Sequence, residues 1–209
     1  GEQSSRNWGW CRVMGRDPRE VPLALESLNI WRSMNERVGA ETGFRQCGIL
    51  YLADSDASLA EKQAWYEKTA KPYGLTTHVI GPDKVEELQP GASIRGKGAL
   101  YTPSDCRAEP FIAVPAMARQ VMTLGGHVVQ HCAVRGIETS GGRVSGVVTE
   151  KGRIACEQVV VAGGAGSSLF LRAAGGTIPQ LSVLAPVAQT EAMPQGFAGV
   201  GAAAAIVFF

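Results

Sequence analysis

The sequence has few of the residues that build metal centres and disulfide frameworks. Its three histidines show no ligand spacing such as H-E-x-x-H, which argues against a structural metal. Its five cysteines, an odd number, lie far apart and form no C-x-x-C pair. This usage argues against a disulfide framework and favours a reducing compartment, so we expect a cytoplasmic protein.

Charge of one sign and long apolar runs are also scarce. The formal net charge is +1 and no basic stripe is present, which argues against nucleic acid or an anionic membrane surface as a partner. The apolar run at residues 202–209 is far shorter than the about 20 residues that a membrane-spanning helix needs. We therefore expect a globular protein without a transmembrane segment, and small-molecule chemistry as its function.

Residues 158–168 pass from an apolar run to a glycine-rich turn within a few positions. The apolar run Val159–Ala162 predicts a buried strand, and glycines follow at 163, 164 and 166. Ser167 or Ser168 is then expected to cap a helix over residues 169–173. Free N–H groups at such a turn favour an anion, so the stretch predicts a contact to a diphosphate. An ordinary strand-to-helix connection explains the same pattern equally well.

The rest of the chain alternates helical and strand patterns. Helices are predicted near residues 18–38, 58–73, 82–88 and 110–124, with Pro115 expected to kink the last one or move its start. Strands are predicted at residues 45–53, 76–80, 98–102, 127–132, 134–138, 143–149, 153–156 and 181–191, with hairpin turns at 140–142 and 150–152. This mixture predicts an α/β (α+β) fold with two interleaved domains.

The two ends suggest that the sequence is part of a longer protein. Residues 1–6 are polar, without an initiator methionine, and the chain stops inside the apolar run 202–209. We therefore expect a fragment.

Four stretches, taken together and in this order, resemble one family. They are Gly1–Arg12, Cys47–Ala53, Tyr101–Pro110 and Val159–Ser168. They resemble the flavoprotein amine oxidoreductases of the D-amino-acid oxidase, glycine oxidase and sarcosine oxidase group, and the likeness covers nearly the whole chain. It implies an incomplete FAD-binding domain of the glutathione-reductase-like type (residues 1–43 and 103–177), interleaved with an antiparallel-sheet substrate-binding domain (residues 44–102 and 178–209).

The sequence also departs from the family pattern. No G-x-G-x-x-G follows a predicted strand, because Gly199-Val200-Gly201 with Ala204 lacks both a preceding buried strand and a later acidic residue. The family usually has a bulky residue near Gly166 and a glycine near Cys106. The resemblance therefore implies that the N-terminal Rossmann βαβ unit and the C-terminal part of the family fold lie outside this chain.

The resemblance implies FAD as cofactor and a set of cofactor contacts. Ser4, Ser5, Arg6 and Asn7 would lie along the diphosphate and flavin, and Val134 would lie against the adenine. The second diphosphate turn would consist of Gly163, Gly164, Ala165 and Ser167. A polar surface loop is the competing interpretation of residues 4–7. The nearby Trp8 and Trp10 favour the cofactor interpretation, since pairs of tryptophans facing solvent are uncommon.

The implied reaction is oxidation of the C–N bond of a D-amino acid or of an N-methylated or secondary amino acid, by hydride transfer to the flavin. Arg12 is the candidate for binding the substrate carboxylate, although a surface arginine is the commoner situation. Tyr51 faces the substrate or packs within its strand. No catalytic base is assigned, and two electron acceptors stay open, oxygen and a membrane carrier. The second would place the protein at the inner face of a membrane.

A non-catalytic α/β binding or interaction module is the alternative function. It predicts a compact monomer that unfolds cooperatively without flavin. A piece of a flavoenzyme would instead expose apolar surface and associate into oligomers.

Overall fold

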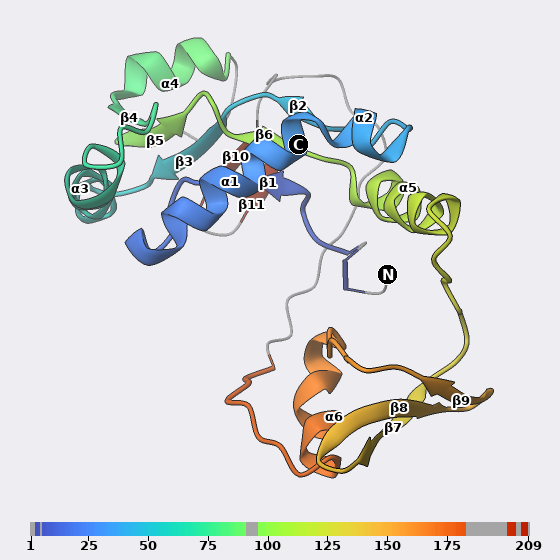
Figure 1. The fold of residues 1–209 in the computed structure, drawn as a ribbon. Coiled ribbons are helices and arrows are strands. Elements are labelled where there is room, and N and C mark those ends of the chain that lie inside the picture. The colour runs from blue at the N-terminus through green and yellow to red at the C-terminus, as the bar shows by residue number, and fades with distance from the viewer. Residues whose placement is uncertain (1–2, 5, 91–95, 183–199, 204–205, 209) are drawn as a thin grey trace. The chain divides into compact units, whose positions relative to one another are not determined.

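The computed structural model describes residues 3–4, 6–90, 96–182, 200–203 and 206–208 (Figure 1). The chain divides into two compact units, one formed by residues 1–120 and 187–209 and the other by residues 121–186. The domain boundaries expected from the family resemblance stay a prediction.

The first unit contains two sheets in which most strand pairs are antiparallel. The smaller sheet has the order β1-β6-β2, formed by Trp10–Cys11, Cys106–Arg107 and Arg45–Gln46. The larger sheet has the order β11-β10-β3-β5-β4, formed by Ile206–Phe208, Val200–Ala203, Ile49–Ala53, Gly98–Thr102 and His78–Ile80. Only the β10–β3 pair runs parallel among these described strands. This mixture of helices and antiparallel sheet confirms the predicted fold class.

The helices of the first unit follow the predicted positions with local corrections. They are η1 (Pro18–Glu20), α1 (Val21–Arg32), α2 (Met34–Val38), α3 (Asp56–Trp65), the π-helix η2 (Tyr66–Ala70), α4 (Pro82–Leu88) and α5 (Pro110–Thr123). The single helix expected over residues 18–38 is wrong, because Ser33 leaves helical geometry between α1 and α2. Pro115 lies inside α5 without moving its start.

The start of α3 corrects a second expectation. The helix begins at Asp56, and the Ser55 hydroxyl caps it by accepting a hydrogen bond from the Ser58 amide at 3.2 Å. The sequence pointed instead to Ser58 as the first capping residue. Ser55 caps the helix because its extended backbone lets the hydroxyl reach the free amide of the first turn.

The strand predicted over residues 45–53 is two strands in different sheets. β2 ends at Gln46 and β3 begins at Ile49, and Gly48 between them has a φ of +72°. A Cβ at this position would lie 2.8 Å from the Tyr101 hydroxyl oxygen. Glycine is therefore required here both for its backbone angle and for the close approach of the Tyr101 ring.

β3 lies between two apolar clusters because successive side chains of a strand point to opposite faces. Ile49 packs with Met14 and Leu100 on one face, and Leu50 packs with other apolar residues on the other face (Leu52, Val85, Ala99). A third cluster joins α1 to the smaller sheet through Val13, Val21, Leu28 and Cys106. The core of the first unit is thus assembled around β3 and its neighbours.

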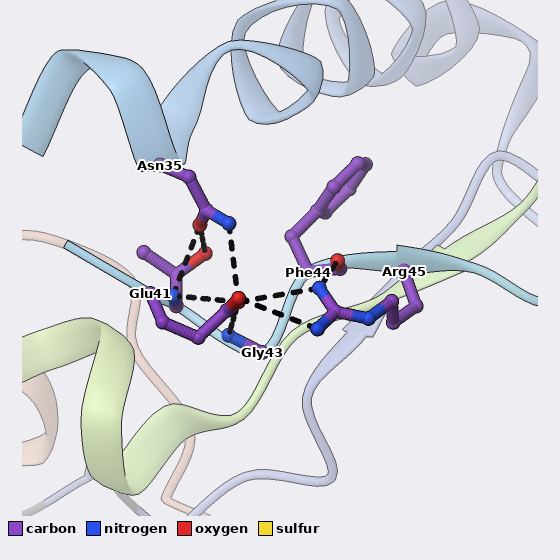
Figure 2. A network of polar contacts seen from close by, with 6 residues as sticks. Asn35, Glu41, Gly43, Phe44 and Arg45 are labelled. Carbon is purple, nitrogen blue, oxygen red and sulfur yellow. Dashed lines mark hydrogen bonds and ion pairs between the residues drawn. The ribbon is translucent and has the colours of Figure 1, made fainter. Parts of the chain in front are cut away.

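A polar network holds the connection between α2 and β2 (Figure 2). One carboxylate oxygen of Glu41 accepts hydrogen bonds from the Asn35 amide group (3.1 Å), the Gly43 backbone N–H (2.7 Å) and the Arg45 guanidinium (3.2 Å). The neighbouring Thr42 carbonyl accepts the Glu109 amide at 2.9 Å. The network therefore fixes the loop against which α5 begins.

The second unit contains a three-stranded antiparallel sheet and a short helix. Its strands are β7 (Val134–Ser140), β8 (Arg143–Thr149) and β9 (Gly152–Ala155). The predicted turn at 140–142 is confirmed, because Ser140 pairs with Arg143 and the two glycines between them have φ angles of +56° and +78°. η3 (Gly164–Gly166) and α6 (Ser167–Ala173) follow.

Two predicted strands of the second unit are wrong. Residues 127–132 and Val159–Ala162 form no strand, and the Val160 side chain is 89% exposed. An apolar run predicts a buried strand only where a neighbouring strand pairs with it, and no described strand pairs with either run. The predicted strand at residues 181–191 falls, from residue 183 on, outside the described residues.

No helix among the described residues has both the length and the apolar character required to cross a membrane.

Candidate functional site

A cavity of about 570 Å³ in the first unit brings together several of the predicted site residues. Ser4, Asn7 and Arg12 line it from the N-terminal segment. Apolar side chains of α1 and α5 complete the wall, among them Leu28, Trp31, Ala113 and Met117. A cavity of this size with a mainly apolar wall and a few polar groups is typical of sites for small molecules and cofactors.

Several described polar residues near the N-terminus make local hydrogen bonds. The Asn7 side chain donates to the Ser4 carbonyl (2.6 Å) and accepts from the Gly9 amide (2.7 Å). The Arg6 amide donates to the Gln3 carbonyl at 3.1 Å. Ser5 lies outside the described residues. Asn7 is thus bonded to both Ser4 and Gly9, and all three residues line the cavity.

Gly9 ties this turn to the loop before α5. Its φ is +72°, and any Cβ there would overlap the Ala108 carbonyl. The Ala108 amide donates to the Gly9 carbonyl at 2.8 Å. A side chain at Gly9 would therefore separate the two segments that form this edge of the cavity.

Aromatic rings surround the Arg12 guanidinium. Its Cζ lies 5.8 Å from the centroid of Trp10 and 5.6 Å from that of Tyr51. The Trp10 ring is 5.2 Å from Trp8 and 5.6 Å from Tyr51. Arg12 also donates a hydrogen bond to the Met14 carbonyl. Within the described residues no carboxylate forms an ion pair with Arg12.

Arg12 and Tyr51, the two predicted substrate residues, are therefore neighbours although 39 positions separate them in sequence. Both are partly buried. Burial raises the pKa of Tyr51, while Arg12 opposes this shift. The phenol is therefore neutral at physiological pH, and the guanidinium supplies the local positive charge.

Asp105 lies behind this cluster and is not among the residues that the sequence pointed to. Its side chain is fully buried and accepts the amide hydrogens of Val13 (2.9 Å) and Met14 (3.1 Å). Burial raises the pKa of Asp105 to about 6, against the lowering effect of those two bonds and of Arg12 and Arg16. In the sequence Asp105 is only an aspartate within a predicted loop. Its hydrogen-bond partners lie about 90 positions away, so no local pattern indicates its role.

Two thiols face each other across the smaller sheet, where Cys11 pairs in register with Cys106. Burial raises the pKa of Cys11 to about 12 and that of Cys106 to about 11. Both thiols are therefore protonated at physiological pH and are poor nucleophiles. In the described part of the chain, no group of three His, Cys, Asp or Glu side chains is arranged to hold a metal ion.

A second cavity, of about 480 Å³, lies within the second unit. Three predicted cofactor residues line it, Val134 from β7, Gly163 and Ser167, together with Phe170 of α6. Gly164 and Ala165 belong to η3, directly beside this wall. Three of the five residues predicted at the adenine and at the second diphosphate turn thus line one cavity, and the other two follow Gly163 directly in the chain.

The cap predicted for α6 is wrong in its residue. Gly166 occupies the N-cap position, and neither Ser167 nor Ser168 caps the helix through its side chain. The Gln180 side chain accepts the Ser168 amide at 3.0 Å and donates to the Gly164 carbonyl at 2.8 Å. Sequence reasoning misses this contact because it recognises caps only from residues next to the helix.

Comparisons with known proteins identify the family of the chain. The sequence model of the family DAO, described as FAD dependent oxidoreductase, matches residues 1–204. Sarcosine dehydrogenase from Mus musculus is 30% identical over 78% of this chain and 18% of its own length. D-amino acid dehydrogenase from Sinorhizobium medicae is 34% identical over 84% of this chain and 44% of its own.

A solved structure is also similar. L-amino acid deaminase from Proteus myxofaciens, in complex with anthranilate, has a TM-score of 0.78 and 34% identity, covering 85% of this chain and 40% of that one. The chain thus spans less than half the length of these three relatives. These findings confirm the resemblance and do not favour the interaction module. The chain belongs to the family of FAD-dependent oxidoreductases.

Proposed function

We propose that the chain forms part of an enzyme that oxidises the C–N bond of a D-amino acid or of an N-methylated or secondary amino acid with FAD as hydride acceptor. One observation carries the proposal: Arg12 is partly buried in a cavity wall, flanked by two aromatic rings, with no carboxylate paired to it within the described residues. Two relatives support the substrate class, since their names refer to sarcosine and to D-amino acids.

Arg12 would bind the substrate carboxylate. A guanidinium carries five N–H donors, and Met14 takes one of them. The remaining donors allow the two parallel hydrogen bonds that arginine forms with a carboxylate. Trp10 and Tyr51 reduce the access of water to the guanidinium, which strengthens that pairing. The related L-amino acid deaminase was solved in complex with anthranilate, an aromatic amino carboxylate, which makes anthranilate a suitable probe of this assignment.

The residues present fit FAD at both cavities. We propose Ser4, Ser5, Arg6 and Asn7 as cofactor contacts. Of these, Ser4 and Asn7 line the first cavity, where the Asn7 side chain donates a hydrogen bond to the Ser4 carbonyl. At the second cavity we assign Val134, Gly163, Gly164, Ala165 and Ser167, where the absence of side chains at two glycines permits close approach of a ligand. The Ser168 amide is engaged by Gln180 and is left out of the assignment. When bound, FAD supplies the acceptor for the hydride.

We further infer that the protein acts in the cytoplasm, at the inner face of a membrane if its electron acceptor is a membrane carrier, and that it forms oligomers. All five cysteines are free thiols, which fits a reducing compartment. Exposed apolar side chains such as Leu124 and Leu169 support association. Oxygen consumption measured against reduction of a quinone analogue separates the two acceptors.

The test compares Arg12→Leu with Arg19→Leu in the FAD-loaded chain. Arg19 is a matched control because its side chain is 89% exposed and pairs only locally with Asp17. Anaerobic bleaching of the flavin band by sarcosine and by D-alanine measures the reaction. We expect Arg12→Leu to raise the substrate concentration needed for half-maximal bleaching by about 100-fold or more, because the substrate carboxylate loses a charged, bidentate partner. Equal kinetics in the two variants would refute the assignment of Arg12.

A further inference from the structure

Asp105 connects three segments of the first unit. Its carboxylate accepts the amides of Val13 and Met14, its carbonyl accepts the Gly48 amide at 3.0 Å, and its own amide donates to the Thr102 carbonyl at 3.2 Å. These partners lie in the loop after β1, at the entry to β3 and at the end of β5. A single buried side chain with its backbone therefore sets the relative positions of these three segments.

Met14 extends this connection to Arg12. Its amide is bound by Asp105 Oδ2, and its carbonyl accepts a hydrogen bond from the Arg12 guanidinium. Met14 has no exposed surface, so its peptide groups have no competing water. The Tyr51 ring beside the guanidinium belongs to β3, whose entry is also bound by Asp105. The position of Arg12 is thus tied to Asp105 from two directions.

We propose that ionised Asp105 is a positioning residue for Arg12. By accepting two adjacent amides at once, it holds the Met14 carbonyl in the direction that orients the guanidinium in the cavity wall. The inference deepens the proposed function and rests on it where it calls Arg12 a carboxylate anchor.

The charge environment makes this role dependent on pH. Arg12 and Arg16 favour the ionised carboxylate, whereas burial favours the neutral acid, and the resulting pKa of about 6 lies above the ordinary 3.8. The other titratable groups that act on Asp105 or feel its charge are Tyr51, Cys11, Cys47 and Cys106, and burial raises the pKa of each, so all are neutral near pH 6. A protonated carboxyl becomes a donor at one oxygen and holds the two amides less well.

The pH dependence of stability and that of the order of Arg12 together distinguish a positioning role of Asp105 from a purely stabilising one. Because the folded-state pKa is raised, this group's contribution to stability is fully present below the unfolded-state value and is lost as pH rises through about 6. The order of Arg12 is expected to change in the opposite sense and to increase over the same interval. A merely structural role of Asp105 would change stability in this way and leave the order of Arg12 constant over the same interval.

The experiment records NMR signals of the Val13 and Met14 amides and of the Arg12 Nε–H group in the 209-residue chain, between about pH 4 and about pH 8. We expect all three signals to titrate with one midpoint near 6. An Arg12 signal that stays constant while the two amides titrate would overturn the proposal. This measurement needs neither flavin nor substrate, and no variant has to fold.

Variants extend the test to ligand binding, with anthranilate as probe. Asp105→Asn replaces one carboxylate oxygen by an NH₂ group, a donor that would face the amide of Val13 or Met14. We expect the Arg12 signal to lose its pH dependence in this variant. We also expect anthranilate to bind about tenfold more weakly. Thr102→Val is the matched control, since it removes only the buried hydroxyl bond to Thr77 (2.8 Å). Equal losses in both variants would overturn positioning. If anthranilate fails to bind the unmodified chain, the assignment of Arg12 as a carboxylate anchor in this chain is wrong, while the NMR titration still decides the role of Asp105.

Discussion

The two units bury their apolar residues to very different extents. In the first unit, residues such as Val21, Ile49 and Leu50 have no exposed surface. In the described part of the second unit, no apolar side chain is buried, and Val160 and Leu181 are 89% and 94% exposed. Regular secondary structure therefore does not require a buried apolar core, because the described part of the second unit has strands and a helix but no buried apolar side chain.

The difference follows from how the strands pair. In the first unit, β1 pairs with β6 and β3 pairs with β5, so segments far apart in sequence enclose side chains on both faces. In the second unit, β7, β8 and β9 are joined by two tight turns and form a meander whose pairing is entirely local. A meander forms from turn chemistry alone, whereas a buried face requires a second layer.

The largest expected contrast concerns amide hydrogen exchange. We expect the amides of β3 to exchange roughly 100-fold or more slowly than those of β8, because local opening of β8 exposes no buried apolar cluster. Exchange followed by NMR or mass spectrometry measures this directly. Similar protection in both strands would show that the meander is stabilised by interactions that its exposed side chains do not reveal.

Core truncation gives the next largest contrast. Leu50→Ala removes a fully buried side chain and should cost about 2–5 kcal/mol of unfolding free energy. Ile154→Ala removes one that is 49% exposed and should cost about 1 kcal/mol or less. Chemical denaturation followed by circular dichroism compares them, and a larger loss for Ile154→Ala would contradict the contrast between the units.

Two glycines with positive φ provide a smaller contrast. At Gly9 an added Cβ overlaps the Ala108 carbonyl, whereas Gly141 has open space around it. Gly141→Ala should therefore cost only the backbone penalty of about 1–2 kcal/mol. Gly9→Ala should cost about 2 kcal/mol more, because the loop before α5 must move. All four tryptophans lie in the first unit, so tryptophan fluorescence reports Gly9→Ala, and circular dichroism reports Gly141→Ala.

The smallest effect is expected at exposed carboxylates. Hydrogen bonds from Arg45, Gly43 and Asn35 lower the pKa of Glu41 to about 2. Its contribution to stability is therefore present above the ordinary value near 4.5 and is lost as pH falls through about 2. Glu41→Gln should reduce stability slightly at pH 7 and not at all in strong acid, as measured by denaturation at the two pH values. A loss that persists in strong acid would assign the effect to packing instead of charge.

Local patterns predicted the positions of most elements and the turn at Gly141 and Gly142, because these depend on neighbouring residues. They wrongly predict strands at Val159–Ala162 and at residues 127–132, since no described strand pairs with either segment. Whether such a run becomes a strand depends on segments distant in sequence.

The same distinction applies to the site. The family resemblance pointed to Arg12 and Tyr51, which the structure places side by side. No sequence signal marks Asp105 or Gln180, because their roles consist of hydrogen bonds to residues about 90 and 12–16 positions away. No local spacing rule relates such partners, so they become visible only when the fold is known.

We propose that the cavity of the first unit receives the flavin, and Trp10 and Trp31 line this cavity. Titration of the 209-residue chain with FAD, followed by tryptophan fluorescence and the visible flavin bands, tests this binding. If the flavin binds there, we expect saturable quenching of the tryptophans together with a shift of the flavin bands. Unchanged flavin bands and unquenched tryptophans up to about 1 mM FAD, which sets a limit of about −4 kcal/mol on the binding free energy, would contradict it.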